Sequence, residues 1–232
     1  MPFVNVTSLW PWLGWLSLAM LLGISLPPKA QAETFINLPA ASLQGGLTVP
    51  QAIQHRRTIR RFAARPLTLE QVAQLLWAAY GITDPRGLRA APSAGALYPL
   101  DVYLVVGERQ VAGLASGVYH YYPDKHALLS RQSGELRQAV GRASLHQMWL
   151  AEAPVLLVIT AEYRRCQAKY GSRGVRYTLM EVGHVGQNIF LQAEAMGLGA
   201  GIIGAFDDAA ISRILNLPAA HEPLLLMPVG YK

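Results

Sequence analysis

The sequence predicts an α+β domain, on three observations. Helical and strand-like segments are mixed along the chain without the regular strand–helix–strand alternation of a parallel α/β fold. One long helical pattern, over residues 178–196, stands among shorter strand-like runs. Of the 232 residues, 52% are apolar and 15% are charged, so we expect a well-buried core rather than a disordered chain.

The first half of the chain contains two helical segments and a long loop. The segment 48–61 opens with threonine and proline, which favour a helix start, and runs into a cluster of arginines. The segment 68–81 begins with the capping-box pattern Thr-Leu-Glu-Gln, continues with apolar residues at helical spacing and ends on a glycine. Residues 82–99 are rich in Gly, Pro and Ala and predict a long loop, which in a compact domain is usually functional or disordered.

Strand-like runs dominate the rest of the chain. A Pro-Asp-Lys turn joins two of them into a hairpin. The continuous apolar run at 155–160 is typical of a central strand. The glycine-rich stretch 199–206 fits a strand edge, and the aspartates that follow it can cap a short helix. We therefore expect strands at 100–106, 118–122, 127–129, 155–160 and 224–229, with short helices at 135–143, 144–152 and 207–215.

The long helix, closed by Gly197, carries two glycines in its interior. Gly183 and Gly186 each cost about 1 kcal/mol relative to alanine, which suggests that another backbone packs closely against them. That backbone belongs either to the core of the same chain or to a second copy at a dimer interface. The apolar stripe that we expect to be buried consists of Leu179, Val182, Gly186, Ile189, Phe190 and Ala193.

The N-terminal segment has the pattern of a secretory signal peptide. Residues 9–26 are almost wholly apolar, and Ala-Gln-Ala at 30–32 supplies a small-x-small cleavage site. We expect residues 1–32 to be removed and the protein to be exported to the periplasm or another extracytoplasmic compartment. Because a run of about 18 apolar residues is nearly long enough to span a bilayer, an uncleaved membrane anchor is the alternative. Residues 33–47 then form a surface linker, and 48–232 form the folded domain.

Several kinds of site are disfavoured by the sequence. The one cysteine, Cys166, cannot form an intrachain disulfide and lacks companions for a zinc site. The histidines do not stand at metal-ligand spacing, so we expect no metal. The fingerprints GxGxxG, GxxxxGK[ST] and GxSxG do not match. The net charge of +6 is modest, and outside one cluster Lys and Arg are scattered, so nucleic-acid binding is not expected.

Four stretches are candidates for chemistry. In HRRTIRRF, residues 55–62, guanidinium groups and a hydroxyl can bind a phosphate, or form a solvated basic face. In PSAGALYP, residues 92–99, small side chains let backbone amides approach a planar or anionic ligand, or form a plain loop. In GAGIIGAFDD, residues 199–208, backbone donors can face a ligand edge. Residues 169–173, just before the long helix, can supply an acid or a substrate clamp, or form a solvated loop.

The order of these stretches resembles that of the nitroreductase-like flavoenzymes. The pattern R-R-[ST]-x-R-x-F, then PSAGALYP before a strand, then a long helix ending GLGAG before IIGAFD is similar to theirs. The resemblance is closest to the azoline-forming dehydrogenase branch, of the SagB and ThcOx type. It covers roughly residues 52–230 and includes PLTLEQVAQLLWAAYGIT, RAAPSAGALYPLDVYLVV and KYGSRGVRYTLMEVGHVGQNIFLQAEAMGLGAGIIGAFDD.

The resemblance implies a three-layer sandwich, with a mixed or antiparallel sheet flanked by helices, that forms a homodimer holding FMN between its subunits. The residues that would grip the phosphate and ribityl end of FMN are Arg56, Arg57, Thr58 and Arg60. The loop that the partner subunit would lay along the isoalloxazine contains Pro92, Ser93, Ala94 and Ala96. The backbone of Gly204 and Ala205 would approach the N5 edge, whereas Arg61 falls outside the motif as a surface charge.

The function that the resemblance implies is an FMN-dependent oxidoreductase that transfers hydride by a ping-pong mechanism. The electron donor would be NADH or NADPH; in the azoline-forming branch it would be the substrate, with reoxidation by oxygen. The substrate would be a small or peptide-derived molecule. Our candidates for acid/base or clamping roles are Lys169, Tyr170, Arg173 and Tyr177. The alternative is an exported flavin-binding protein, or an accessory protein of a modification pathway, without catalytic turnover.

Overall fold

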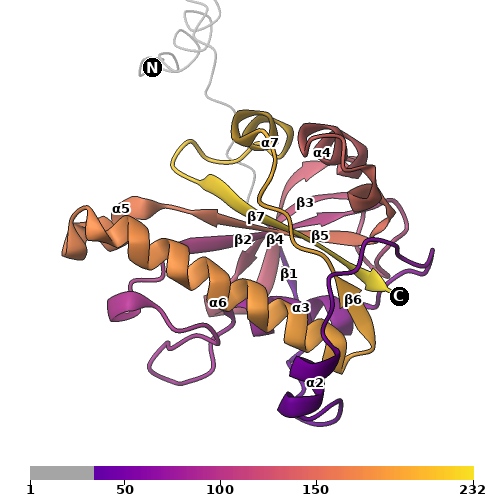
Figure 1. The fold of residues 1–232 in the computed structure, drawn as a ribbon, viewed down its shortest axis with the longest axis horizontal. Helices are drawn as coiled ribbons and strands as arrows, with labels where there is room; N and C mark the ends of the chain where they lie inside the picture. The colour runs from indigo at the N-terminus through magenta and orange to yellow at the C-terminus, as the bar shows by residue number, and fades with distance from the viewer. Residues whose placement is uncertain (1–33) are drawn as a thin grey trace, which may run out of the picture. The chain divides into compact units, whose positions relative to one another are not determined.

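A seven-stranded antiparallel sheet forms the centre of the fold (Figure 1). The computed structural model of the protein describes residues 34–232, and the predicted signal peptide or anchor, residues 1–32, lies outside them. The strand order is β1-β4-β3-β2-β5-β7-β6. The strands are β1 Phe35–Asn37, β2 Leu100–Val106, β3 Gly117–Tyr122, β4 Ala127–Ser133, β5 Val155–Ala161, β6 Leu198–Ala200 and β7 Glu222–Tyr231.

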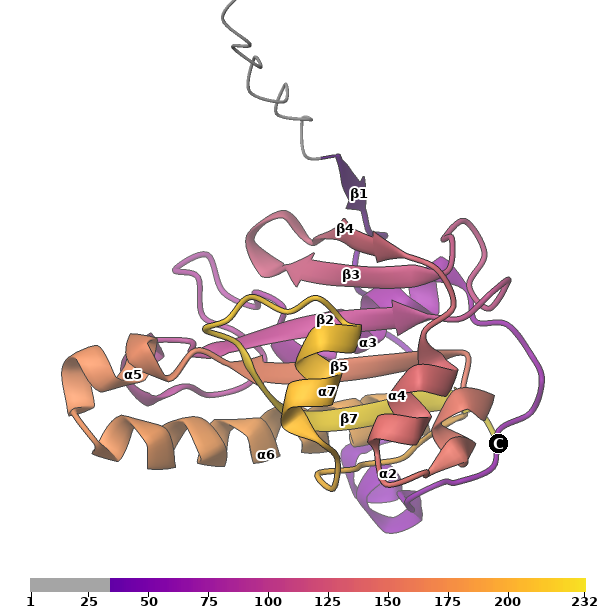
Figure 2. The same cartoon turned by 90° about the horizontal axis from the view of Figure 1, so that it is seen from above.

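Helices cover both faces of the sheet, which gives the three layers (Figure 2). Because alternate residues of a strand face opposite sides, Val102 and Leu104 of β2 pack in the core under α3 and α6, whereas Tyr103 and Val105 pack in the core under α4 and α7. The expected α+β sandwich is therefore confirmed. The helices are α2 Val49–His55, α3 Leu69–Tyr80, α4 Arg137–Ala143, α5 Tyr163–Tyr170, α6 Arg173–Ala195 and α7 Asp208–Ile214, with 3-10 turns η1 Ala94–Ala96, η2 Pro123–Lys125 and η3 Met148–Glu152.

Most predicted elements lie where the sequence placed them. Helix α3 begins with the expected capping box, in which the Gln71 backbone donates to the Thr68 side chain at 3.3 Å, and Gly81 follows its last residue. The strands predicted at 100–106 and 155–160 are β2 and nearly all of β5. Both are buried along almost their whole length, because they are neighbours in the middle of the sheet.

Three segments differ from their sequence-based assignments. The linker predicted over 33–47 contains β1, an edge strand paired with β4, and three residues are too few to show a hydrophobic period. Helix α2 ends at His55, because Arg56 leaves the helical conformation with ψ 122°, so the arginines lie in extended chain. Residues 169–173, considered above as a loop, are the end of α5 and the start of α6, separated by Gly171 with φ 56°.

The buried face of α6 also differs from the predicted stripe in its first half. Leu179 is 50% exposed, and the buried positions in that half include Thr178 and Glu181, of which Glu181 accepts a hydrogen bond from Tyr80 of α3. A Cβ on Gly183 would meet open space, and one on Gly186 would meet only side chains. The expected close approach of another backbone is therefore wrong within this chain, and the interface with a second copy stays a prediction. Among residues 34–232, no helix has both the length and the apolar character to cross a membrane.

Candidate functional site

The arginine stretch runs beside the glycine-rich stretch at the edge of the sheet. Thr58 bridges Ala200 of β6 in parallel register, and the Ile59 backbone N–H donates to the Ala200 carbonyl at 2.8 Å. A Cβ on Gly201 would lie 2.9 Å from the Ile59 carbonyl oxygen and 2.8 Å from the Trp149 ring. Glycine is required for this close approach. Two of the stretches predicted to form the site, 55–62 and 199–208, are thus brought together by the fold.

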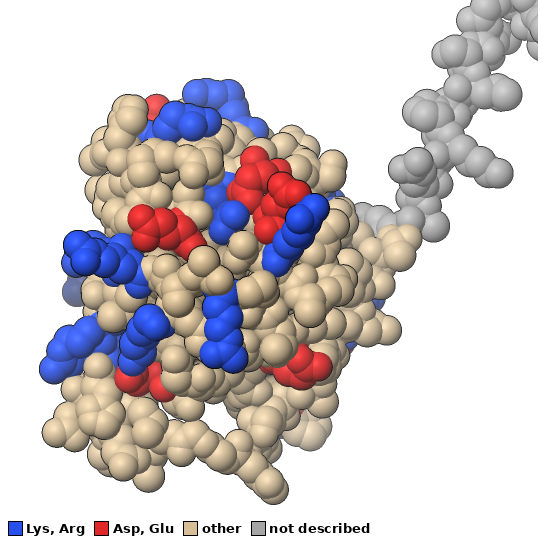
Figure 3. Space-filling model, turned by 90° about the vertical axis from the view of Figure 1, so that its right-hand side faces the viewer, with Lys and Arg blue, Asp and Glu red and all other residues tan. Residues whose placement is uncertain are grey.

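The guanidinium groups of this stretch have no acidic partners. The Arg56 guanidinium lies 5.0 Å from the Phe190 ring centroid on α6, and that of Arg60 lies 5.8 Å from the Trp149 ring. Arg57 donates to the backbone carbonyls of Gln54 and Arg56, at 3.0 and 2.7 Å, at the end of α2. Within residues 34–232 none of these arginines forms an ion pair. The face seen in Figure 3 carries several Lys and Arg side chains, with Asp and Glu side chains among them.

Free backbone donors lie at the end of the glycine-rich stretch. Ile203 exchanges two hydrogen bonds with Leu226 of β7, both at 2.9 Å. Beyond it, Gly204 and Ala205 are exposed, and their N–H groups have no hydrogen-bond acceptor among the described residues. The only bond recorded for this pair there is to the Ala205 carbonyl, from Gln147 at 3.3 Å. These two N–H groups are therefore available to a ligand.

The PSAGALYP stretch, which we call loop 92–98, has an unusual backbone. Gly95, Ala96 and Tyr98 have φ values of 62°, 53° and 48°, in the left-handed region. The Tyr98 backbone N–H donates to the Ser93 hydroxyl at 3.0 Å, which ties the two ends of the loop together. Pro92, Gly95 and Ala96 are exposed at the surface. The loop therefore presents its tip outward in a fixed shape.

Three of the four candidate catalytic residues lie next to this loop. A Cβ on Gly95 would meet the Tyr170 hydroxyl at 2.7 Å and the Lys169 ammonium at 3.2 Å. The rings of Tyr170 and Tyr177 pack edge to face with centroids 5.1 Å apart, and the Lys169 ammonium lies 5.5 Å from the Tyr170 ring. Arg173 is exposed, and within the described part of the chain its side chain has no ring or cation–π contact with these groups. Lys169, Tyr170 and Tyr177 thus form one cluster with the loop tip, and Arg173 is not part of it.

The two halves of the predicted site lie at opposite ends of α6. Arg56 packs on Phe190 near the end of this helix, whereas Tyr170 packs on Tyr177 near its beginning. Thirteen residues separate these contacts, which is about 20 Å along a helix. Figure 1 shows the same separation, with α2 beside one end of α6 and α5 beside the other. One chain therefore does not bring loop 92–98 to its own arginine stretch.

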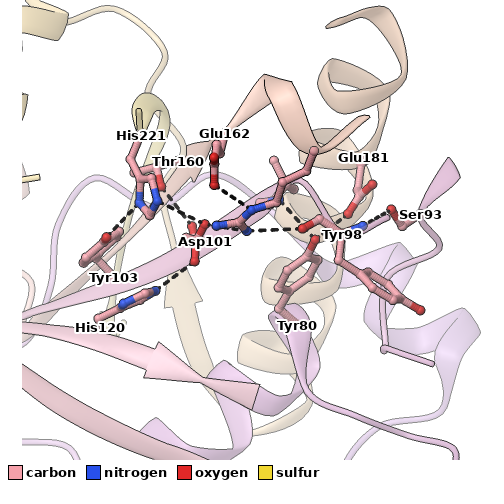
Figure 4. A network of polar contacts seen from close by, with 12 residues as sticks. Tyr80, Ser93, Tyr98, Asp101, Tyr103, His120, Thr160, Glu162, Glu181 and His221 are labelled. Atoms are coloured by element: carbon pink, nitrogen blue, oxygen red, sulfur yellow. Dashed lines mark hydrogen bonds and ion pairs between the residues drawn. The ribbon is translucent and has the colours of Figure 1, made fainter. Parts of the chain in front are cut away.

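A buried polar network, which the sequence did not point to, holds α5 to the sheet (Figure 4). Asp101 of β2 binds Arg165 of α5 at 2.8 Å and the His120 ring at 2.9 Å, and Tyr103 pairs with His221 at 2.8 Å. Burial raises the pKa of Asp101, but the hydrogen bond from His120 and the charge of Arg165 outweigh it and leave the pKa below its ordinary value. Burial lowers the pKa of His221. The sequence contains one feature that could have indicated this network, which is an aspartate as the second residue of the otherwise apolar strand β2.

A second network joins α3, α6 and loop 92–98. The Tyr80 hydroxyl donates to Glu181 of α6 at 2.6 Å and accepts from the Leu100 backbone at 3.2 Å. Glu181 is 1% exposed, and it occupies a position on the buried face of α6 where an apolar residue would be usual. Within residues 34–232, no group of three or more His, Cys, Asp or Glu side chains could hold a metal ion.

Comparisons with known proteins match almost the whole described chain to one family. The Nitroreductase family model matches residues 53–231. MJ1384 of Methanocaldococcus jannaschii, a nitroreductase by name, is 47% identical over 177 residues, which cover 76% of this chain and 87% of the relative. The microcin B17-processing protein McbC of Escherichia coli is 29% identical over 157 residues, which cover 65% of this chain but only 57% of McbC. A solved structure from Ralstonia eutropha JMP134, also a nitroreductase by name, has a TM-score of 0.73 and 25% identity, and the match covers 100% of this chain and 98% of that one.

Proposed function

Since the chain belongs to the nitroreductase family of oxidoreductases, we propose that it is an FMN-dependent enzyme that transfers hydride by a ping-pong mechanism. The observation that carries this proposal is the pairing of Ile59 with Ala200. It joins arginines that form no ion pair within residues 34–232 to the stretch that leads into the free N–H groups of Gly204 and Ala205. An elongated ligand with a phosphate at one end and a planar hydrogen-bond acceptor at the other fits such a surface. FMN has this form, and when bound it would supply the hydride-carrying ring.

The arginine stretch would bind the phosphate. Charge-assisted hydrogen bonds from guanidinium to phosphate are the strong ones in proteins, and no carboxylate among the described residues competes for these groups. Thr58 adds a hydroxyl donor. Arg57 already donates to two backbone carbonyls, so we assign it a smaller share than Arg56 and Arg60.

The backbone of Gly204 and Ala205 would donate to the flavin ring. Their N–H groups are exposed and without an acceptor among the described residues, and the Ile203 pair with Leu226 fixes their position. Fixed donors at the place where negative charge develops stabilise the reduced ring without reorganising. Because these donors are backbone N–H groups of a glycine and an alanine, no charged side chain is placed at the flavin ring by these two residues.

We propose a homodimer as the working form. The two halves of the site lie at opposite ends of α6, and a second copy packed with its α6 antiparallel to the first would bring its loop 92–98 to the arginine stretch. The outer face of α6 suits this packing, because Leu179 and Met180 are 50% and 49% exposed and Gly183 leaves open space between the turns. Ile53 on α2 is likewise 55% exposed.

Lys169, Tyr170 and Tyr177 would face the substrate. Lys169 and Tyr170 contact the tip of loop 92–98, and Tyr177 packs on Tyr170. In the proposed dimer this tip would lie on the flavin of the partner subunit, so a substrate on the flavin would meet this cluster. We propose a peptide-derived or other small substrate, because McbC is by name the microcin B17-processing protein. The electrons would come from NADH or NADPH, or from the substrate with oxygen as the acceptor.

The test is to purify the protein and examine it for flavin. We expect a yellow protein with one FMN per subunit, bleached under nitrogen by NADH, by NADPH or by a peptide substrate. Flavin that binds and is never reduced by any donor would support an accessory protein without turnover. A protein that binds no FMN even after reconstitution would overturn the proposal.

A further inference from the structure

Loop 92–98 carries backbone strain that its own contacts do not explain. Ala96 and Tyr98, at φ 53° and 48°, occupy the left-handed region that side chains other than glycine rarely adopt. Strain of this kind persists only where the surroundings enforce it, and it is common at ligand contacts. Inside the loop, the Tyr98 N–H donates to the Ser93 hydroxyl, and the backbone N–H groups of Ala96 and Leu97 donate to the carbonyls of Ser93 and Ala94 at 3.1 and 3.3 Å. The remaining restraint must come from the groups beneath.

The group directly beneath is a buried carboxylate. Glu181 accepts from the Tyr80 hydroxyl at 2.6 Å, and its second oxygen is buried without a hydrogen bond among the described residues. Burial raises the pKa of Glu181, while the hydroxyls of Ser93 and Tyr80 and the charge of Arg89 act in the opposite direction. A carboxylate placed there costs folding free energy relative to an apolar residue, so packing alone does not account for it.

The opposite charge is supplied by Arg89, from the chain just before the loop. Its guanidinium carbon lies 4.4 Å from the ring centroids of both Tyr80 and Tyr98. The Arg89 backbone N–H also donates to the Tyr98 hydroxyl at 3.2 Å. The side chain of the strained Tyr98 is therefore fixed against a cation, and the same cation lies against the ring of Tyr80, which donates to Glu181. Charge, cation–π contacts and hydrogen bonds converge on one end of the loop.

We propose that Glu181, Tyr80 and Arg89 are positioning residues that hold loop 92–98 in its flavin-contacting shape, and that they act on the flavin bound by the other subunit. The inference rests on the proposed function, in which each flavin takes its arginines from one subunit and its loop from the partner. The same three residues would set the place of the loop tip against Lys169 and Tyr170.

The first test compares FMN affinity among homodimeric variants. Glu181→Ala removes the acceptor and the charge, whereas Glu181→Gln keeps an acceptor for Tyr80. We expect the dissociation constant for FMN to rise at least about tenfold in Glu181→Ala, as for loss of a fixed contact. The visible circular dichroism of the flavin bound to Glu181→Ala should also change. Glu181→Gln should recover part of the lost FMN affinity. Tyr80→Phe tests the same link should Glu181→Ala fail to fold. Val118→Ala, in the core on the opposite face of the sheet, is the control for lost stability.

The decisive test uses mixed dimers, made by co-expressing two differently tagged chains. One chain carries Arg56→Ala with Arg60→Ala, and the other carries Glu181→Ala, or Tyr80→Phe if that is the variant that folds. If the positioning residues act across the interface, one site takes the altered arginines from the first chain and the altered loop support from the second, so that site carries both defects. The other site then takes both parts from unaltered segments, so the mixed dimer binds one FMN with the parent affinity. If they act within their own subunit, both sites are defective.

The outcomes separate this inference from the function that it rests on. A mixed dimer with one intact site supports the inference, and a mixed dimer with none overturns it. Homodimers of the Glu181 and Tyr80 variants that bind FMN like the parent, with an unchanged flavin spectrum, also overturn it while leaving the proposed function in place. A parent protein that binds no FMN removes the proposed function itself.

Discussion

The Ile59 N–H donates to the Ala200 carbonyl oxygen at 2.8 Å, and this bond joins two stretches that lie about 140 residues apart in the sequence. Glycines on either side of Ala200 make the approach possible, because a Cβ on Gly199 would lie 2.7 Å from the Ile59 side chain and one on Gly201 would lie 2.9 Å from the Ile59 carbonyl oxygen. This contact places the arginine stretch beside β6, and the Ile203 pair with Leu226 then fixes the free N–H groups of Gly204 and Ala205. The first prediction concerns the contact itself.

Gly201→Val should separate the two stretches. The added side chain has no room beside the Ile59 carbonyl and the Trp149 ring, so the arginines should move away from the backbone donors. We expect the dissociation constant for FMN to rise by about tenfold or more, as for one lost charge-assisted contact. Isothermal titration of the flavin-free protein measures it. Unchanged affinity would show that the pairing does not build the site.

Lys169→Met and Tyr170→Phe should lower turnover and retain flavin. Both side chains contact the loop tip, at a distance from the arginines of the same chain, so they belong to the substrate side. Loss of a general acid or base typically costs 10²- to 10⁴-fold in rate, and we expect a loss of about 10²-fold or more. Arg173→Ala is the matched control, since its side chain is exposed beside the cluster. A larger loss in the Arg173 variant would mean that the substrate-side residues have been assigned wrongly.

Leu179→Glu with Met180→Lys should produce a monomer that binds FMN weakly. The two side chains are about half exposed on the outer face of α6, so charges there are tolerated by the monomer but not in an apolar interface. Light scattering after gel filtration reports the mass, and flavin content reports the site. A dimer of normal flavin content would place the interface elsewhere.

Acidification should destabilise the protein through the Asp101 network. The folded pKa of His221 lies below 6.5, so its protonation favours the unfolded chain, and stability is lost as the pH falls below about 6.5. The folded pKa of Asp101 lies below 3.8, so its contribution is present above that value and is lost only as the pH falls through the folded pKa.

The melting temperature, plotted against pH, should therefore fall in two separate steps as the pH is lowered, and we call these the upper step and the lower step. His221→Gln should remove the upper step and keep the lower one, whereas Asp101→Asn should remove the lower step and reduce stability at neutral pH. Because Arg165 ties Asp101 to α5, Asp101→Asn should also reduce turnover. An upper step that persists in His221→Gln would assign it to another group.

The sequence was sufficient for those parts of the fold that depend on local patterns. The capping box at Thr68 predicts the start of α3, and the apolar run 155–160 predicts the central strand β5. Three-residue β1 gives no such pattern, since its place depends on pairing with β4. Helix α5 was missed because it is short and mostly polar, and the pairing of Arg165 with Asp101 that holds it is not local.

The candidate site was predictable in its parts but not in their arrangement. The order of the stretches indicated the family, and the family indicated which residues to consider. The sequence could not show that Arg56 packs near the end of α6 while Lys169 lies near its beginning, because helix direction and packing decide that separation. It also could not identify Glu181, whose position on an apolar stripe becomes unusual only once its burial is known.

The most direct test of the proposed flavin site is the FMN affinity of three arginine variants measured side by side. Arg56 and Arg60 are predicted to bind the phosphate, and Arg61, exposed in the same stretch, is not. One lost guanidinium–phosphate contact of about 1.5–3 kcal/mol corresponds to a roughly 10- to 100-fold weaker complex. We predict that loss for Arg56→Ala and Arg60→Ala and parent affinity for Arg61→Ala; a weaker complex for Arg61→Ala than for Arg56→Ala would contradict the assignment.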